Sequence, residues 1–173
     1  MIGAVNRPAL AGDSPQNRQD DAAFYVTFGD VTVDADGRLL SQAQVIRDVI
    51  AEAELADSLG VDFFGVGEHH RADFAISAPE VVLAAIAGRT TRMRLMSAVR
   101  VLSSDDPIRV FQRFSTIDAA SNGRAEVILG RGPFTESFPL FGFRLDDYGT
   151  LFEEKLDLLA ALLAHDGRND PVS

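Results

Sequence analysis

The chain has 173 residues, of which 46% are hydrophobic and 24% charged, with a formal net charge of −10, the composition of an ordinary globular domain. The acidic excess argues against nucleic acid and anionic membrane surfaces as partners, because both are bound by clustered Lys and Arg. The absence of cysteine excludes disulfides, thiolate metal sites and a cysteine nucleophile.

The two ends of the chain differ in composition from the middle. Residues 1–22 carry two prolines and a polar run and are predicted to form a flexible extension. This segment lacks the layout of a signal peptide, and no apolar run of the chain reaches the ~20 residues of a membrane span. The sequence therefore predicts a cytoplasmic protein with a folded domain at residues 23–165 and a polar tail at residues 166–173.

A strand, a turn and a helix are predicted at the start of this domain. The β-rich run Phe24–Phe28 predicts the first strand, and Asp34–Gly37 has the composition of a hairpin-type turn. Ser41 is a suitable N-cap and Gly60 a suitable stop for the helix between them. The positions expected to face the core recur at helical spacing: Val45, Ile46, Val49, Ile50, Ala53, Ala56 and Leu59.

Three further strands are predicted at Val61–Val66, Arg94–Val99 and Ala125–Leu129. Each is followed by a segment with helical signals, so the strands alternate with helices along the chain. Such alternation implies a parallel sheet with right-handed crossovers.

The helices between these strands are marked by their ends. One is predicted from Pro79 to about Gly88, and the next from the cap-plus-proline pair Asp106-Pro107 to Asn122-Gly123. A long loop, Gly130–Asp147, then precedes a last helix at Tyr148–Ala164. The core positions expected on this helix are Leu151, Phe152, Leu156, Leu159, Leu162 and Leu163.

Four β-α units predict an α/β fold. A parallel sheet must be covered on both faces or closed on itself, so a doubly wound open sheet and a partial (β/α)8 TIM barrel are both compatible with the pattern. A full barrel takes eight units and typically ~250 residues. Periodicity alone does not choose between the two architectures.

Residues able to carry chemistry gather at the carboxyl ends of the predicted strands, where parallel α/β folds build their ligand sites. They are Thr27-Phe28, Glu68-His69-His70-Arg71, Ser97-Ala98 and Gly130-Arg131-Gly132. The second stretch concentrates titratable groups at one strand end, and it contains two of the three histidines of the chain.

The adjacent histidines allow three interpretations. An imidazole can give and take protons near neutral pH, and because neighbouring residues of an extended segment point to opposite sides, one of the two would face the pocket. A metal site is a rival interpretation, although adjacent histidines rarely chelate one ion and the helical H-E-x-x-H spacing is absent. The third is a solvated surface loop without chemistry.

The glycine-rich and small-residue stretches are less specific. Gly65-Val66-Gly67 lacks the third glycine of the dinucleotide-binding pattern, and no phosphate-binding loop of the NTPase type is present. Gly130-Arg131-Gly132 could bring backbone and a guanidinium to a phosphate, or be a turn with an exposed Arg. Ser97-Ala98 would leave room for a flat ring, or simply pack within the strand.

Taken together, the motifs resemble those of the luciferase-like flavin-dependent monooxygenases. The resemblance runs in order from about Phe24 to Ala164. The stretches that carry it are Thr27-Phe28-Gly29-Asp30, Val66-Gly67-Glu68-His69-His70, Leu102 to Pro107, Ser121-Asn122-Gly123-Arg124, Leu129 to Gly132, Phe138 to Gly142, and Leu151 to Lys155.

This resemblance implies a TIM barrel that binds reduced FMN at its carboxyl-end face, activates O2 and oxidises a small organic substrate such as an aldehyde. It implies catalytic roles for His69, beside the reactive edge of the flavin, and for Glu68. Ser97-Ala98 corresponds to a stretch with a cis peptide against the flavin, and Arg131 to an arginine associated with its phosphate. The cofactor-binding residues implied are Thr27, Phe28, Ser97, Ala98, Gly130, Arg131 and Gly132.

Two alternatives to this function remain at this stage. Relatives in the same superfamily use the deazaflavin F420 for hydride transfer without oxygen. The other alternative is a non-catalytic half-barrel, because the second half of the barrel is missing from these 173 residues. We therefore expect a truncated form, one that pairs with a complementary half-barrel, or a homo-oligomer.

Overall fold

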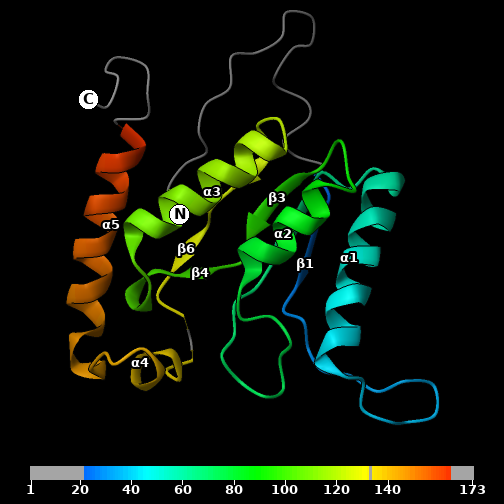
Figure 1. Ribbon diagram of the computed structural model, residues 1–173, viewed down its shortest axis with the longest axis horizontal. Coiled ribbons are helices and arrows are strands. Elements are labelled where there is room, and N and C mark those ends of the chain that lie inside the picture. Colours follow the sequence, from blue (N-terminus) through cyan, green and yellow to red (C-terminus); the bar gives the residue numbers. More distant parts are fainter. Residues whose placement is uncertain (1–21, 133, 165–173) are drawn as a thin grey trace, which may run out of the picture.

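A computed structural model describes residues 22–132 and 134–164 (Figure 1). The predicted N-terminal extension, apart from Ala22, and the predicted tail lie outside the described residues. The strands are β1 (Phe24–Thr27), β2 (Phe63–Val66), β3 (Arg94–Ser97), β4 (Arg100–Val101), β5 (Ala125–Glu126) and β6 (Leu129–Gly130). The α-helices are α1 (Gln42–Leu59), α2 (Pro79–Ala87), α3 (Pro107–Ala120), α4 (Ser137–Leu140) and α5 (Tyr148–Ala164).

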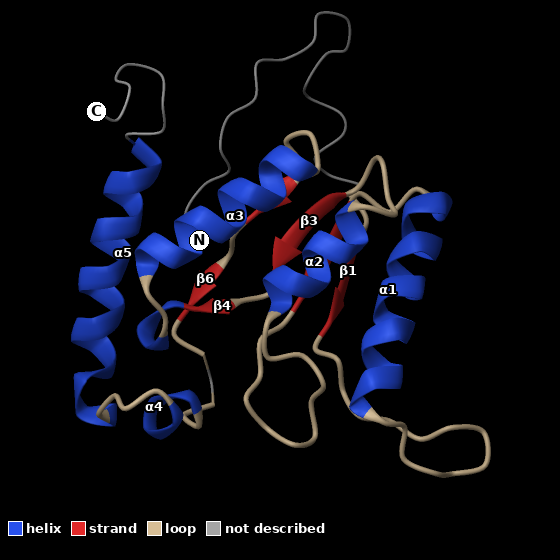
Figure 2. Cartoon of the chain, in the orientation of Figure 1, coloured by secondary structure: helices blue, strands red, loops and turns tan. Residues whose placement is uncertain are grey.

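Four strands form a parallel sheet in the order β1-β2-β3-β5, which is also their order along the chain. Helices α1, α2 and α3 lie against the same face of this sheet (Figure 2). A doubly wound sheet would carry helices on both faces. The chain is therefore wound in one direction, as a section of a (β/α)8 barrel is.

The predicted helix ends are confirmed by their backbone geometry. The Ser41 side chain accepts the Gln44 N–H at the start of α1, and Gly60 ends this helix with a φ of 89°. At the start of α3 the Asp106 side chain accepts the N–H groups of Ile108 and Arg109. Local capping chemistry therefore defines these elements before any tertiary contact is made.

The fourth predicted strand, Ala125–Leu129, is divided into β5 and β6. The reason is the Ser97 hydroxyl, which accepts the Ile128 N–H and donates to the Ile128 carbonyl, both at 3.0 Å. A side chain thus replaces the backbone ladder at this point. The chain after β3 then forms β4, which pairs with β6 in a separate two-stranded sheet.

Two predicted core positions are wrong, because both residues are exposed. Leu59, in the last turn of α1, is 74% exposed, and Leu163, near the end of α5, is 40% exposed. On α5 only Leu159 is buried, and this helix packs mainly on α3 and on the 3-10 turn Leu102–Ser104.

The two faces of the sheet differ sharply in burial. Phe64, Val66 and Leu95 point toward the helices and are fully buried. On the opposite face, Phe24 and Val26 of β1 are exposed, as are Phe28 and Ile128 in the segments that follow β1 and β5, whereas Met96 of β3 is buried. This exposed apolar face, which we call the open face, corresponds to the interior of a closed barrel.

Candidate active site at the carboxyl end of the sheet

Strand alternation separates the predicted site residues onto two sides. On the open face, a Cβ added to Gly67 would lie 2.5 Å from a ring carbon of Phe28 and 3.4 Å from the carbonyl oxygen of Ala98. The His69 ring lies on this side too, 5.5 Å from the Phe28 ring in an edge-on arrangement. The structure therefore brings Phe28, His69 and Ala98 together at one end of the sheet.

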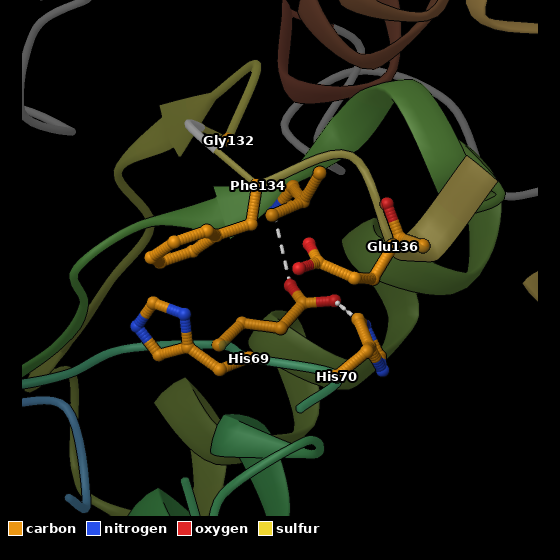
Figure 3. A pocket seen from close by; sticks show the side chains of 8 residues that line it. His69, His70, Gly132, Phe134 and Glu136 are labelled. Carbon is orange, nitrogen blue, oxygen red and sulfur yellow. Dashed lines mark hydrogen bonds and ion pairs between the residues drawn. The ribbon is translucent and has the colours of Figure 1, made fainter. Parts of the chain in front are cut away.

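The His69 ring is enclosed by aromatic side chains. It stacks on Phe74 at 4.0 Å and meets the edge of Phe134 at 5.3 Å, and Figure 3 shows Phe134 above it. Both ring nitrogens are buried and have no hydrogen-bond partner among the described residues. Burial lowers the pKa of His69, against the opposing effect of Asp30 and Glu68. A neutral imidazole with a free donor and a free acceptor results.

The lowered pKa of His69 makes a prediction about stability. The unfolded chain takes up a proton on His69 near its ordinary pKa of 6.5, whereas the folded chain takes it up only at lower pH. The stability that the neutral His69 ring contributes is therefore complete above pH 6.5 and is lost as the pH falls below it. Urea unfolding at pH ~7.5 and ~5.5 should show a larger loss for the wild-type chain than for His69→Phe. Equal losses would contradict the lowered pKa.

Glu68 lies on the other side of the segment and is buried. Its Oε1 is 2.9 Å from His70 Nε2, and its Oε2 accepts the Val101 N–H at 2.9 Å and pairs with Arg100 at 3.0 Å. Its carboxylate is thus held by three partners and directed away from the open face, so a catalytic role for Glu68 remains a prediction. The His69 and His70 rings point apart in Figure 3, although both residues line the same small pocket. Among the described residues, no group of three or more His, Cys, Asp or Glu side chains could hold a metal ion.

Small residues form the floor beside His69. A Cβ on Gly65 would lie 3.1 Å from both the Ala98 Cβ and Val26 Cγ2, so a glycine is needed for these small residues to pack this closely. The cis peptide lies between Ala98 and Val99, one residue later than the expected Ser97-Ala98. Ser97 points away from the floor because its hydroxyl bridges to Ile128, which corrects its expected place beside a ring.

We predict that Gly67→Ala disrupts this floor of small residues. The added methyl would lie 2.5 Å from Phe28, and the displaced ring would occupy the space beside His69. Reduced FMN affinity should fall at least tenfold in the complemented chain described below, as an anaerobic titration would measure. Gly88→Ala is the matched control, because the nearest atom there is 3.7 Å away. Unchanged affinity in Gly67→Ala would exclude the floor as a binding surface.

Thr27 and Arg131 lie away from His69. The Thr27 hydroxyl accepts the Gly29 N–H at 3.2 Å, and Thr27 lines a different hollow, next to α1. The Arg131 guanidinium lies over the rings of Tyr148 and Phe152, at 6.0 and 5.2 Å. Of His69, Ser97, Ala98 and Arg131, which the resemblance places around one flavin, the structure therefore brings only His69 and Ala98 to the same side of the sheet.

Gly130 and Gly132 serve backbone packing. Their Cβ atoms would lie 2.4 Å from a methyl of Val99 and 3.0 Å from a methyl of Val101. Gly132 also lines a small pocket of about 10 Å3, close to the space of one water molecule. The residues around this pocket are Glu68, His69, His70, Val101, Gly132, Phe134, Glu136 and Ser137.

Sequence reasoning missed a buried cluster of charges behind the two histidines. Its members are Glu68, Glu80, Arg100, Asp105 and Arg113. Arg100 offered a signal, since a lone arginine follows the apolar run of a predicted strand. The aromatic partners Phe74 and Phe134 offered none, because they lie on separate loops.

Parallel β-α units wound in one direction, with the histidine pair at the carboxyl ends of the strands, define a partial TIM barrel. The chain belongs to the luciferase-like monooxygenase family, whose model matches residues 24–172. Among curated proteins it is 34% identical to the 4-hydroxyprotoasukamycin monooxygenase of Streptomyces nodosus subsp. asukaensis over 122 residues, which are 70% of this chain and 32% of that protein.

Solved structures share the fold. The monooxygenase RslO1 from Streptomyces bottropensis superposes with a TM-score of 0.74 at 25% identity, covering 87% of this chain and 46% of that one. The oxygenating constituent of 3,6-diketocamphane monooxygenase from Pseudomonas putida, solved with FMN, gives 0.72 at 21% identity over 87% and 42%. An F420-dependent secondary alcohol dehydrogenase gives 0.64 at 17% identity over 88% and 44%.

The chain thus spans less than half the length of the relatives described above. Among the described residues, no helix is both long and apolar enough to cross a bilayer.

Proposed function

We propose that this chain provides the His69 side of a flavin-dependent monooxygenase that uses reduced FMN and O2 to oxidise a small organic substrate such as an aldehyde, in the cytoplasm. The observation that supports this most directly is a neutral imidazole, with no hydrogen-bond partner for either nitrogen among the described residues, beside a floor of Gly65, Gly67 and Ala98. Such small residues can carry a planar ring, and such an imidazole can transfer a proton near neutral pH.

The residues present fit a flavin ring. Reduced FMN, when bound, would supply the electrons that activate O2. Gly67 and Ala98 would carry the face of the ring, and Phe28, which is 44% exposed, would cover its apolar part. His69 would donate or accept a proton at one of its imidazole nitrogens, while Phe74 and Phe134 exclude water from the imidazole.

Fewer of the predicted residues are placed to bind a phosphate group. The segment Gly130-Arg131-Gly132 offers backbone N–H groups, but Arg131 would have to leave the rings of Tyr148 and Phe152 to reach a phosphate. Its role in phosphate binding therefore remains a proposal that depends on this rearrangement.

F420 is the second candidate cofactor, since one solved structure of this fold is an F420-dependent dehydrogenase. The same floor could carry a deazaflavin ring, and His69 could then take the proton in a hydride transfer. A non-catalytic half-barrel within a homo-oligomer is the candidate from a different class. The exposed apolar side chains Phe24, Val26, Phe28 and Ile128 favour a partner for the open face in every case.

The test is a titration of FMN and F420 into the chain, alone and together with the C-terminal half of the Streptomyces nodosus monooxygenase as a separate polypeptide. We expect FMN to bind in its reduced form to the complemented chain, followed by O2 uptake with an aldehyde. Binding of F420 alone would favour hydride transfer. A complemented barrel, monodisperse in sedimentation, that binds neither cofactor would disprove the proposal.

A further inference from the structure

The buried charge cluster behind the histidines joins elements that are far apart in the sequence. Its members lie just after β2, in the first turn of α2, in β4, directly before the cap of α3, and in α3 itself. The exposed fractions of its side chains are 1% for Glu68, 8% for Arg100, 11% for Glu80, 14% for Asp105 and 32% for Arg113. Two arginines and three carboxylates thus share one site, in which every side chain except that of Arg113 is largely buried.

Arg100 is the centre of this cluster. Its guanidinium lies 3.0 Å from Glu68 Oε2 and 3.4 Å from Glu80 Oε2, and it also contacts the Asp105 carboxylate. Arg113 meets Glu80 at 2.5 Å and Asp105 at 3.0 Å, but it makes no contact with Glu68. The connection from the cluster to Glu68 therefore runs through Arg100.

Glu68 transmits this connection to the histidine segment. Its Oε1 holds His70 Nε2 at 2.9 Å and its Oε2 accepts the Val101 N–H. His69 is the next residue, and neither of its ring nitrogens has a hydrogen-bond partner among the described residues. The direction of the His69 ring is thus set by its aromatic neighbours and by the backbone that Glu68 anchors.

Burying this many charges is not an efficient way to gain stability, because each carboxylate loses its hydration and hydrophobic residues would pack there at lower cost. Burial acts to raise the pKa of Asp105, but Arg100 and Arg113 hold it below its ordinary value. The Asp105 carboxylate is therefore ionised and directional, which suits a role in fixing geometry.

We infer that Arg100 is a positioning residue for the segment that carries His69 and His70, and that it acts through the carboxylate of Glu68. The forked guanidinium contacts three carboxylates at once, which a lysine ammonium at the end of a flexible stem cannot reproduce. The value of this positioning for catalysis rests on the proposed function, but the positioning itself does not.

The test uses the whole 173-residue chain, without cofactor, and reads the histidine ring protons by NMR. Only three histidines occur in the sequence, and the stacking of His69 on Phe74 gives its ring a strong upfield shift. In Arg100→Met, the His69 and His70 signals should move toward unfolded-chain values or broaden. In Arg113→Met, which loses the same charge from the same cluster, both signals should stay in place.

Glu68→Gln provides a second route if Arg100→Met does not fold, because it keeps the size of the side chain and removes its charge. The His70 signal should move in this variant as well. Unchanged His69 and His70 signals in a folded Arg100→Met or Glu68→Gln chain would overturn the inference, as would equal movement in Arg113→Met. None of these outcomes depends on flavin binding, so a failure here is distinct from a failure of the proposed function.

Discussion

Turnover of the complemented chain with reduced FMN, O2 and an aldehyde should fall about 100- to 10,000-fold in His69→Asn, the range typical for loss of a general acid or base. Asparagine keeps a polar side chain of similar reach but cannot exchange a proton near neutral pH. His69 is the residue to test because both of its ring nitrogens are buried without a partner in the part of the chain that the structure describes and burial lowers its pKa. Single-turnover kinetics would measure the effect.

The affinity for reduced FMN is the control for this variant. The aromatic neighbours of residue 69, which are Phe28, Phe74 and Phe134, are unchanged in His69→Asn. The affinity for reduced FMN should therefore stay within a few-fold of the wild-type value. A loss of binding equal to the loss of turnover would assign His69 to cofactor binding. Turnover within tenfold of wild type would remove it from the chemistry altogether.

Arg124→Met should lower the free energy of unfolding by at least about 4 kcal/mol, since each buried acceptor left without a partner costs ~1–3 kcal/mol. The Arg124 guanidinium donates to the carbonyl oxygens of Ser121, Met93, Ala87 and Thr90, and to the Thr90 hydroxyl, at 2.8 to 3.0 Å. One side chain therefore joins the end of α2, the start of β3 and the end of α3.

Urea unfolding followed by far-ultraviolet circular dichroism suits this measurement, because the sequence contains no tryptophan. Arg89→Met is the matched control. Arg89 pairs with Glu54 in an exposed contact, and such pairs are worth less than ~1 kcal/mol. If Arg124→Met is too unstable to measure, Arg124→Lys should show a smaller loss. Losses of the same size in Arg124→Met and Arg89→Met would show that the hydrogen bonds of Arg124 stabilise the fold no more than an exposed ion pair does.

Much of the fold was predictable because it is specified locally. The Ser41 and Asp106 caps and the stop at Gly60 depend only on neighbouring residues, so the sequence places α1, α2, α3 and α5 to within a residue or two. The short helix α4 lies within the segment Gly130–Asp147, for which the sequence predicts a loop. The positions of β1, β2 and β3 follow from apolar runs in the same way. Leu59 and Leu163 were misassigned because helical spacing does not show which part of a helix surface finds a neighbour.

The direction of winding was decided by tertiary structure. Alternation of strands and helices is the same in a doubly wound sheet and in a barrel, and only the crossover from β1 to β2 to β3 to β5 places α1, α2 and α3 on one face. The division of the fourth strand was equally hidden, because it depends on a hydroxyl of Ser97 that lies 31 positions away from Ile128 in the sequence.

The sequence by itself determined the family resemblance, the helix ends and the place of His69 at a strand end. Only the tertiary structure decided which neighbours surround that imidazole. Strand alternation turns His69 and Ala98 to the open face and Glu68 and Ser97 away from it, and Arg131 lies on aromatic rings of α5. The physical reason is that caps and periodicity act over a few residues, whereas burial, ion pairing and ring stacking join residues that the fold alone brings together.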